Sequence, residues 1–203
     1  MTSVGRRAVL LRAARVWAFP LWWAVKRCGV SGSVAVDVEW WLECMGAERI
    51  RELDTYSRFS YLAGALPEFR ALVHYRLRPA RPLLRFLLRT VYRQESTLTL
   101  DADRIGPGLF IQHGVGTIVT AEVIGSHCWI NQQVTIGHDK RGRPTLGDGV
   151  RVCAGAIVLG PITLHDNATV GPNATVIHDV AAGVTVVAPL AQPLTRDRDA
   201  QHN

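Results

Sequence analysis

Two short segments of the chain concentrate side chains that can do acid-base or ionic chemistry. The first is Gln112-His113, which follows the apolar pair Phe110-Ile111, and the second is His138-Asp-Lys-Arg-Gly-Arg143. An imidazole has an ordinary pKa of about 6.5, so it can take up or release a proton near neutral pH. A cluster of lysine and arginine side chains attracts phosphates and other anionic groups. We therefore treat these two segments as the candidate functional site.

Both segments interrupt a regular repeat, in which an aliphatic residue recurs every six positions between Ile105 and Val187. Spacings of three and four indicate an amphipathic helix, and alternation indicates a half-buried strand, so a period of six fits neither alone. The period is typical of a hexapeptide β-solenoid, a prism whose turns contain about 18 residues and whose axis is filled by the aliphatic side chains. Separate buried strands of a sandwich would not repeat at one constant step. The expected inward residues are Ile105, Ile111, Ile118, Ile124, Ile130, Ile136, Leu146, Val152, Val158, Leu164, Val170 and Val176.

The repeat is broken at two places, and each break coincides with one of the reactive segments. The step from Ile111 to Ile118 is seven, which leaves one extra residue beside His113, and the step from Ile136 to Leu146 is ten. Insertions in a solenoid point outward because its axis has no room for them. We expect Ile111 to share a prism face with Ile130, and Ile118 to lie beneath Ile136. His113 and the long loop would then be about one coil apart.

The residues around the first break resemble a known family. The segment from Gly106 to Val119, GPGLFIQHGVGTIV, is similar to the catalytic coil of the serine acetyltransferases and their polysaccharide-modifying, colanic-acid-type relatives, in the left-handed β-helix acyltransferase superfamily. The segments INQQVTIG at 130–137 and PTLGDGVRVCAGAIVLG at 144–160 continue the likeness in the same order. The resemblance covers roughly residues 60 to 190 and implies an acetyl-CoA-dependent O-acetyltransferase.

The resemblance also implies a role for individual residues. Moving an acetyl group to an alcohol requires a general base for the hydroxyl proton, and in this family the histidine at the position of His113 acts directly, without an acyl-enzyme. Backbone amides at a coil corner can stabilise the thioester oxygen. The residues expected to contact acetyl-CoA are Gly137, Ala154, Gly155, Lys140 and Arg141, and those expected near the acceptor are Gln112, His138 and Arg143. We expect no metal, because no two histidines have the five-residue spacing of the zinc enzymes on this solenoid.

The chain departs from the serine-specific pattern at three positions. Serine acetyltransferases have an aspartate where this chain has Gln112, an orienting aspartate at the position of Leu98, and an Arg-His pair where Gly142-Arg143 precedes Pro144. Asp101 or Asp103 could replace the orienting aspartate if the first coil shifts its register. We therefore expect a sugar, glycan or other small alcohol as acceptor, and serine to be a poor one. Serine O-acetyltransferase is the alternative, and a non-catalytic trimeric scaffold is another.

The first half of the chain is hydrophobic and rich in arginine, and its pattern predicts helices near 8–28, 35–53, 67–77 and 81–93. The predicted fold is α+β: a helical N-terminal region (1–95) followed by a left-handed parallel β-helix of hexapeptide repeats (96–190) and a flexible tail (191–203). Family members bury the flat faces of the prism by packing three copies side by side, so we expect a homotrimer.

Charge and composition bear on the binding partners and the cellular location of the protein. The formal net charge of +6 is modest, and aromatic residues do not alternate with cations as in nucleic-acid-binding proteins, so no nucleic acid is expected. The four cysteines have neither metal nor disulfide spacing, which favours a cytoplasmic protein. The tryptophan-rich run at 16–25 is too short to span a bilayer, which needs about 20 residues. It could contact the inner membrane face peripherally or pack against a neighbouring subunit.

Overall fold

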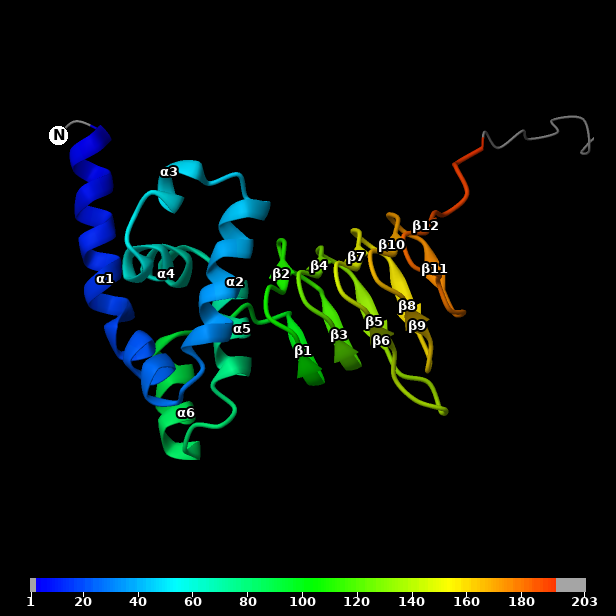
Figure 1. Cartoon of the computed structure of the whole chain (residues 1–203), viewed down its shortest axis with the longest axis horizontal. Coiled ribbons are helices and arrows are strands. Elements are labelled where there is room, and N and C mark those ends of the chain that lie inside the picture. Colours follow the sequence, from blue (N-terminus) through cyan, green and yellow to red (C-terminus); the bar gives the residue numbers. More distant parts are fainter. Residues whose placement is uncertain (1–2, 193–203) are drawn as a thin grey trace, which may run out of the picture.

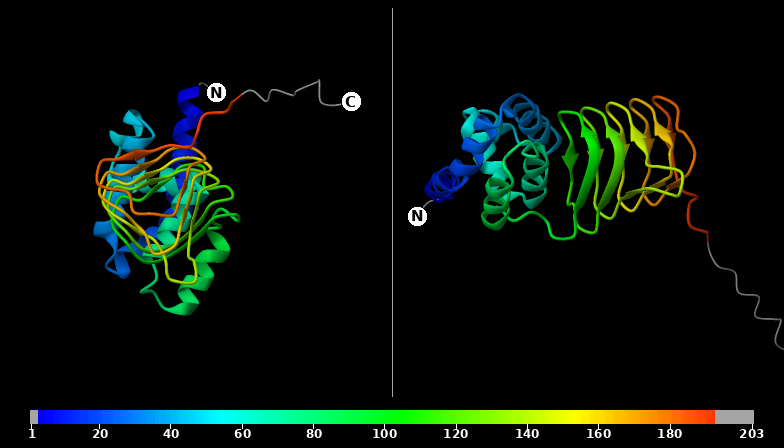
Figure 2. Two further views of the ribbon diagram at one scale, coloured as in Figure 1. Left: turned by 90° about the vertical axis from the view of Figure 1, so that its right-hand side faces the viewer. Right: turned by 90° about the horizontal axis from the view of Figure 1, so that it is seen from below.

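The computed structural model describes residues 3–192 of the chain and shows a block of helices joined end-on to a β-solenoid (Figures 1 and 2). The last helix ends at Val91 and the first strand begins at Thr99. The predicted α+β fold with a parallel β-helix is confirmed. From residue 193 on, the predicted tail lies outside the described residues.

Six helices form the N-terminal block. They are α1 (Ser3–Arg27), α2 (Ser31–Cys44), α3 (Glu48–Arg51), α4 (Thr55–Ala65), α5 (Pro67–Arg76) and α6 (Pro82–Val91). The single helix predicted over 35–53 is wrong, because Gly46 follows α2 with a φ of 60°, a left-handed conformation that ends the helix. Helix α4 was missed by the sequence pattern. Its N-cap is Asp54, whose carboxylate accepts a hydrogen bond from the backbone N–H of Ser57 at 3.1 Å.

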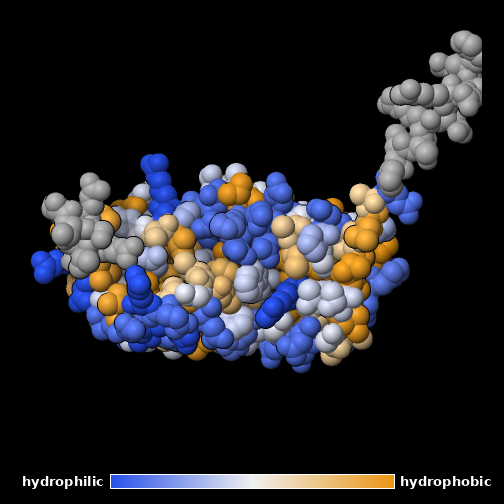
Figure 3. Space-filling view, turned by 90° about the horizontal axis from the view of Figure 1, so that it is seen from above, coloured by the Kyte–Doolittle hydropathy of each residue, from blue (hydrophilic) through white to orange (hydrophobic). Residues whose placement is uncertain are grey.

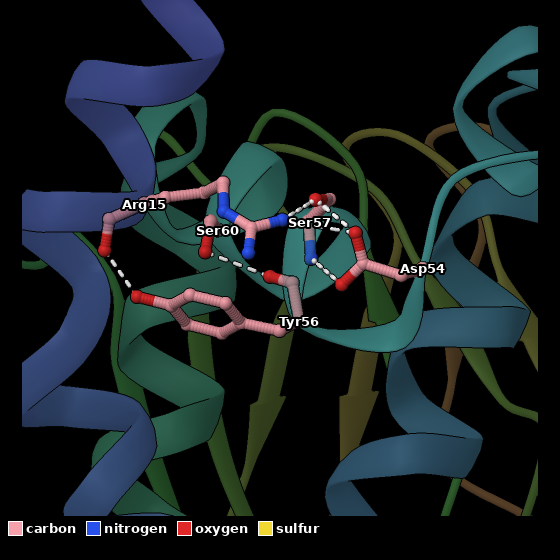
Figure 4. Close-up of polar contacts among 5 residues, drawn as sticks. All are labelled: Arg15, Asp54, Tyr56, Ser57 and Ser60. Atoms are coloured by element: carbon pink, nitrogen blue, oxygen red, sulfur yellow. Dashed lines mark hydrogen bonds and ion pairs between the residues drawn. The ribbon is translucent and has the colours of Figure 1, made fainter.

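Helix α4 is tied to α1 by polar contacts (Figure 4). The guanidinium of Arg15 donates a hydrogen bond to the capping carboxylate of Asp54 at 2.9 Å, and the hydroxyl of Tyr56 donates to the backbone carbonyl of Arg15. Nearby, the ring of Trp22 packs 5.0 Å from that of Phe59. The tryptophan-rich run is thus partly internal, with Leu21 and its inward neighbours fully buried. Within residues 3–192, none of the helices is both long and apolar enough to cross a bilayer.

The solenoid consists of short parallel strands wound around three prism faces. The strands are β1 (Thr99–Ile105), β2 (Phe110–Ile111), β3 (Ile118–Ile124), β4 (Trp129–Ile130), β5 (Thr135–Gly137), β6 (Thr145–Leu146), β7 (Arg151–Val152), β8 (Ile157–Leu159), β9 (Thr163–Leu164), β10 (Thr169–Val170), β11 (Thr175–Val176) and β12 (Thr185–Val186). The first face contains β2, β4, β7, β10 and β12. The second contains the start of β3 with β5, β8 and β11, and the third contains the end of β3 with β6 and β9.

The predicted register is confirmed except at Ile118. Ile111 pairs with Ile130 on the first face, as expected. On the second face it is Val119, fully buried, that pairs with Ile136, whereas Ile118 pairs with Thr135 and is 46% exposed. Compared with a regular step of six, the chain has two more residues between Ile111 and Val119 and one fewer between Val119 and Ile124. Counting along the sequence therefore found the correct net insertion but chose the wrong inward residue.

Helices α2 and α5 close the first coil of the solenoid around a buried ion pair. Asp37 of α2, 1% exposed, accepts two hydrogen bonds from the guanidinium of Arg76 of α5, both at 2.9 Å. Arg76 also donates to the carbonyls of Ile105 and Gly106 at 2.5 and 2.6 Å, and Asp37 accepts from the backbone N–H of Gly108 at 2.7 Å. The first coil has no preceding coil to form hydrogen bonds with its backbone groups. The side chains of Asp37 and Arg76 supply these hydrogen bonds instead.

We predict that Asp37→Asn lowers the free energy of unfolding by about 3 kcal/mol, because it leaves the Arg76 guanidinium buried beside a neutral partner. The midpoint of urea unfolding at a fixed protein concentration measures the change. The control is Glu48→Gln, which removes an exposed pair with Arg51 at 3.6 Å and should cost less than about 0.5 kcal/mol. Equal midpoints for the two variants would contradict the central role of the Asp37–Arg76 pair.

Candidate active site

His113 lies at the tip of a bulge inserted into the first coil. At each corner between the first and second faces, the residue three positions after the inward aliphatic residue has a left-handed backbone conformation. These residues are Gln133, Gly155 and Asn173, with φ of 57°, 70° and 56°. In the first coil the equivalent residue is Gly116, five positions after Ile111. The two extra residues form the bulge, where His113 has an additional positive φ of 56° and an exposed side chain. The insertion therefore presents the imidazole outward from the prism.

The edge that carries His113 continues along the solenoid as a ladder of backbone hydrogen bonds. Gln133 N–H donates to the carbonyl of Val115 at 3.0 Å, and Gly155 N–H donates to the carbonyl of Gln132 at 3.2 Å. The predicted cofactor residues Ala154 and Gly155 thus lie two coils from His113 on the same edge. The N–H of Gly155 already donates within this ladder, so it is not free to bind a ligand oxygen.

Gln112 is held by the second coil. Its Oε1 accepts hydrogen bonds from the indole N–H of Trp129 at 3.2 Å and from the side-chain amide of Asn131 at 2.9 Å. With Oε1 occupied in this way, the side-chain NH₂ group of Gln112 is the part that can contact a ligand. The position before His113 consequently offers a neutral hydrogen-bond donor and no negative charge.

The long loop after β5 lies on a different edge of the prism. It connects β5 on the second face to β6 on the third, whereas His113 lies between the first and second faces. The predicted residues therefore fall into two groups separated by the width of the second face. His113, Gln112, Ala154 and Gly155 lie on one edge, and Gly137, His138, Lys140, Arg141 and Arg143 lie at the other. One chain alone does not bring the two groups together.

Two of the three cations of the loop are already paired. Arg141 donates to the carboxylate of Asp139 at 2.8 and 2.9 Å, and Arg143 forms an ion pair with Asp103 of β1. Lys140 has no ion-pair partner among residues 3–192 and is the cation most available to an anionic ligand. His138 is exposed at the start of the loop. Gly137 is buried at the end of β5, where an added Cβ would lie 3.1 Å from a methyl group of Leu159.

Asp101 and Asp103 do not supply a carboxylate to His113. Strand β1 pairs with β3 along its length, so Asp101 and Asp103 project from the strand rather than from the bulge. Asp101 forms an ion pair with Arg78 at 3.3 Å, and Asp103 pairs with Arg143. The register shift that would have moved them towards His113 does not occur.

The structure places one acidic residue beside the bulge that sequence reasoning missed. Glu68, near the start of α5, is 9% exposed, and its Cγ lies 3.0 Å from the position of a Cβ added to Gly114. A methyl group of Leu98 lies 3.2 Å from the same point. The sequence showed Glu68 only as an acid in the first turn of a helix, which the helix dipole alone explains. A sequence separation of 45 positions from His113 hid the contact.

The cysteines are poorly suited to nucleophilic chemistry. Burial raises the pKa of the Cys128 thiol to about 12, and burial also raises the pKa of Cys153 above its ordinary value. At neutral pH both are therefore protonated, and a thiol is a much weaker nucleophile than a thiolate. Among residues 3–192, no group of three or more histidine, cysteine, aspartate or glutamate side chains is arranged to hold a metal ion.

The chain is similar to hexapeptide-repeat transferases. The family described as bacterial transferase hexapeptide (six repeats) matches residues 143–178. A serine acetyltransferase of Helicobacter pylori (strain ATCC 700392 / 26695) is 36% identical over 164 residues, which cover 74% of this chain and 95% of the relative.

Solved structures share the same arrangement of helices and solenoid. A serine acetyltransferase of Neisseria gonorrhoeae in complex with serine has a TM-score of 0.59 and 27% sequence identity, and the match covers 84% of this chain and 71% of that chain. A serine acetyltransferase of Brucella abortus strain S19 has a TM-score of 0.63 with 83% and 70% coverage. At 24% identity, the second likeness concerns the fold alone.

Proposed function

This chain belongs to the serine acetyltransferase family of hexapeptide-repeat acyltransferases, and we propose that it transfers the acetyl group of acetyl-CoA to the hydroxyl of free serine. At the level of reaction class it is an acetyl-CoA-dependent O-acetyltransferase. The observation that carries the choice of serine is the Helicobacter pylori serine acetyltransferase, of which the chain covers 95% at 36% identity. The expected sugar or glycan acceptor has no support in these comparisons, and serine fits them better.

The site residues support a direct transfer. The imidazole of His113 takes the proton of the acceptor hydroxyl, and the hydroxyl oxygen attacks the carbonyl carbon of the acetyl thioester. The oxyanion that forms needs hydrogen-bond donors, which backbone amides at a coil corner can supply. When the tetrahedral intermediate collapses, the carbon–sulfur bond breaks, and the departing sulfur takes up a proton to become the free thiol of coenzyme A.

Serine was expected to be a poor acceptor because Gln112 and Leu98 stand where serine acetyltransferases have aspartates. The buried Glu68 beside Gly114 weakens that objection, because an acidic side chain is still present at the bulge. The NH₂ group of Gln112 is a suitable donor for the carboxylate of an amino acid. In this proposal the acceptor site differs from that of other serine acetyltransferases in its residues and retains the same substrate.

We also propose that the active protein is a homotrimer. The second face of the prism separates His113 from the long loop within one chain, so a neighbouring prism is needed to place a loop opposite His113. Apolar side chains flank His113 on the surface, with Val115 53% and Ile118 46% exposed. Further hydrophobic groups are exposed on the helical block and at the C-terminal end of the solenoid (Figure 3). Helix α6 alone exposes Leu83, Phe86, Leu87 and Val91.

We predict that His113→Ala lowers kcat by about 10²–10⁴ while leaving the assembly intact. The exposed side chain makes no contact that the fold needs, so the loss would be chemical. Thiol release from acetyl-CoA measures the rate, and sedimentation equilibrium measures the assembly. An alanine variant as active as the wild type would show that His113 is not the base. A trimer without thiol release for any acceptor would favour the non-catalytic scaffold.

The choice of acceptor is tested by a panel of hydroxyl compounds. We predict that free L-serine gives saturable thiol release, with kcat/KM at least about tenfold above that for simple sugars, because the side-chain NH₂ group of Gln112 can donate to the carboxylate of an amino acid, which simple sugars lack. L-alanine, which lacks the hydroxyl, serves as the control and should give no release above hydrolysis. A preference for sugars or oligosaccharides over serine would refute the serine proposal while leaving the acetyltransferase class in place.

Direct transfer predicts a minor role for the cysteines. Cys153→Ala should keep most of the activity, because burial raises the pKa of this thiol and keeps it protonated at neutral pH. Initial rates at varied concentrations of both substrates should give intersecting lines, as expected when both must bind before the thiol leaves. Intact-protein mass spectrometry is the decisive measurement: a stoichiometric acetyl adduct on Cys128 or Cys153, discharged on addition of acceptor, would establish a covalent route instead.

A further inference from the structure

Glu68 is a buried acid whose surroundings do not explain its presence. It is 9% exposed, and among the described residues it forms no hydrogen bond and no ion pair. The nearby guanidinium of Arg70 is directed elsewhere, donating to the carbonyls of Arg93 and Ala63 at 2.6 and 2.7 Å. Its carboxylate oxygens are not among the fully buried unpaired atoms, so they can still be reached by a partner. Glu68 is therefore an acid of low exposure whose carboxylate remains free to accept a hydrogen bond.

The side chain of Glu68 packs against the backbone of Gly114, the residue directly after His113. The Glu68 Cγ, a methyl of Leu98 and a methyl of Ile111 surround the place where a Cβ of residue 114 would be, at 3.0, 3.2 and 3.1 Å. A glycine directly after His113 thus allows α5 to bring its acid against the base of the bulge. A side chain at 114 would push the acid away, since 3.0 Å is closer than carbon atoms normally approach.

The other acids near the first coil have partners. Asp37 binds Arg76, Asp101 binds Arg78, and Asp103 binds Arg143. Glu95 accepts a hydrogen bond from the backbone N–H of Thr97 at 3.0 Å. Of the acids of the helical block and first coil that lie close to His113, Glu68 is the one that remains available.

We propose that Glu68 is the positioning residue for His113, an inference that rests on the proposed role of His113 as general base. Its carboxylate accepts a hydrogen bond from one ring N–H of His113, which fixes the ring orientation and leaves the other nitrogen unprotonated towards the acceptor hydroxyl. When the imidazole takes the proton of the hydroxyl, the carboxylate stabilises the imidazolium. A base at the exposed tip of a bulge gains from such a partner, because among residues 3–192 its ring forms no other side-chain hydrogen bond. The carboxylate comes from helix α5 rather than from the solenoid.

The test compares Glu68→Gln with the wild type in the full-length protein. We expect kcat to fall about 10- to 10³-fold, and the acidic limb of the pH profile of kcat/KM to move to lower pH, because the imidazolium loses its neighbouring negative charge. The matched control is Glu52→Gln, an exposed acid after α3, which should change neither quantity. Glu68→Asp retains the charge but shortens the side chain, and should recover at least about tenfold over Glu68→Gln. If glutamine at 68 disturbs assembly, the aspartate variant still shows both effects in weaker form.

A carboxylate introduced at a neighbouring position tests whether Glu68 positions His113 or only contributes to packing. Leu98 lies beside Glu68 at the same backbone site, so Leu98→Asp added to Glu68→Gln should restore part of the lost kcat. A wild-type kcat and pH profile for Glu68→Gln would overturn the proposal. So would a rise in KM for the acceptor alone with an unchanged profile, which would make Glu68 an acceptor-binding group. If His113→Ala is itself fully active, the general-base proposal fails; if only Glu68→Gln is without effect, this inference alone fails.

Discussion

The buried ion pair between Asp37 and Arg76 is the interaction on which the arrangement of the two halves depends. A solenoid pairs each coil with its neighbours, so its first coil has backbone groups without a preceding coil. Arg76 binds the carbonyls of Ile105 and Gly106, and Asp37 binds the N–H of Gly108. The pair satisfies its own charges and caps the solenoid at the same time. Trp41 adds to this closure by donating from its indole N–H to the carbonyl of Leu109 at 2.6 Å.

This closure also determines which part of the helical block meets the bulge of His113. Helix α5 carries Arg76 near its C-terminal end and Glu68 in its first turn, so the bond that anchors one end of the helix fixes the position of the other. The acid then lies against Gly114 and Leu98. A contact between a helix and a coil separated by more than 40 positions is thus a consequence of how the solenoid is capped. The placement of Glu68 and the capping of the solenoid therefore depend on the same helix.

The division of the predicted site between two edges follows from the geometry of a prism. A residue in a corner between the first and second faces cannot approach a loop between the second and third faces, because a row of strands lies between them. The proposed trimer would bring the two edges together by placing two copies side by side. The exposed apolar residues Val115 and Ile118 beside His113 are consistent with that arrangement. Arg141 and Arg143 already form ion pairs with aspartates. Lys140 is therefore the cation of the loop that is most available to an anionic group.

The sequence by itself determined the solenoid and the position of its two insertions, because a period of six is a local property that each coil repeats. It missed helix α4, although Asp54 and Gly46 are recognisable start and stop signals, because the apolar pattern across residues 35–53 suggested one longer helix. It also chose Ile118 instead of Val119 as the inward residue, since counting cannot show where within a coil two residues are added and one removed. Only the tertiary structure decided that Asp101 and Asp103 are paired with arginines and that Glu68 lies at the bulge. These are contacts between distant segments, and they depend on the docking of α5 against the first coil, which no local pattern encodes.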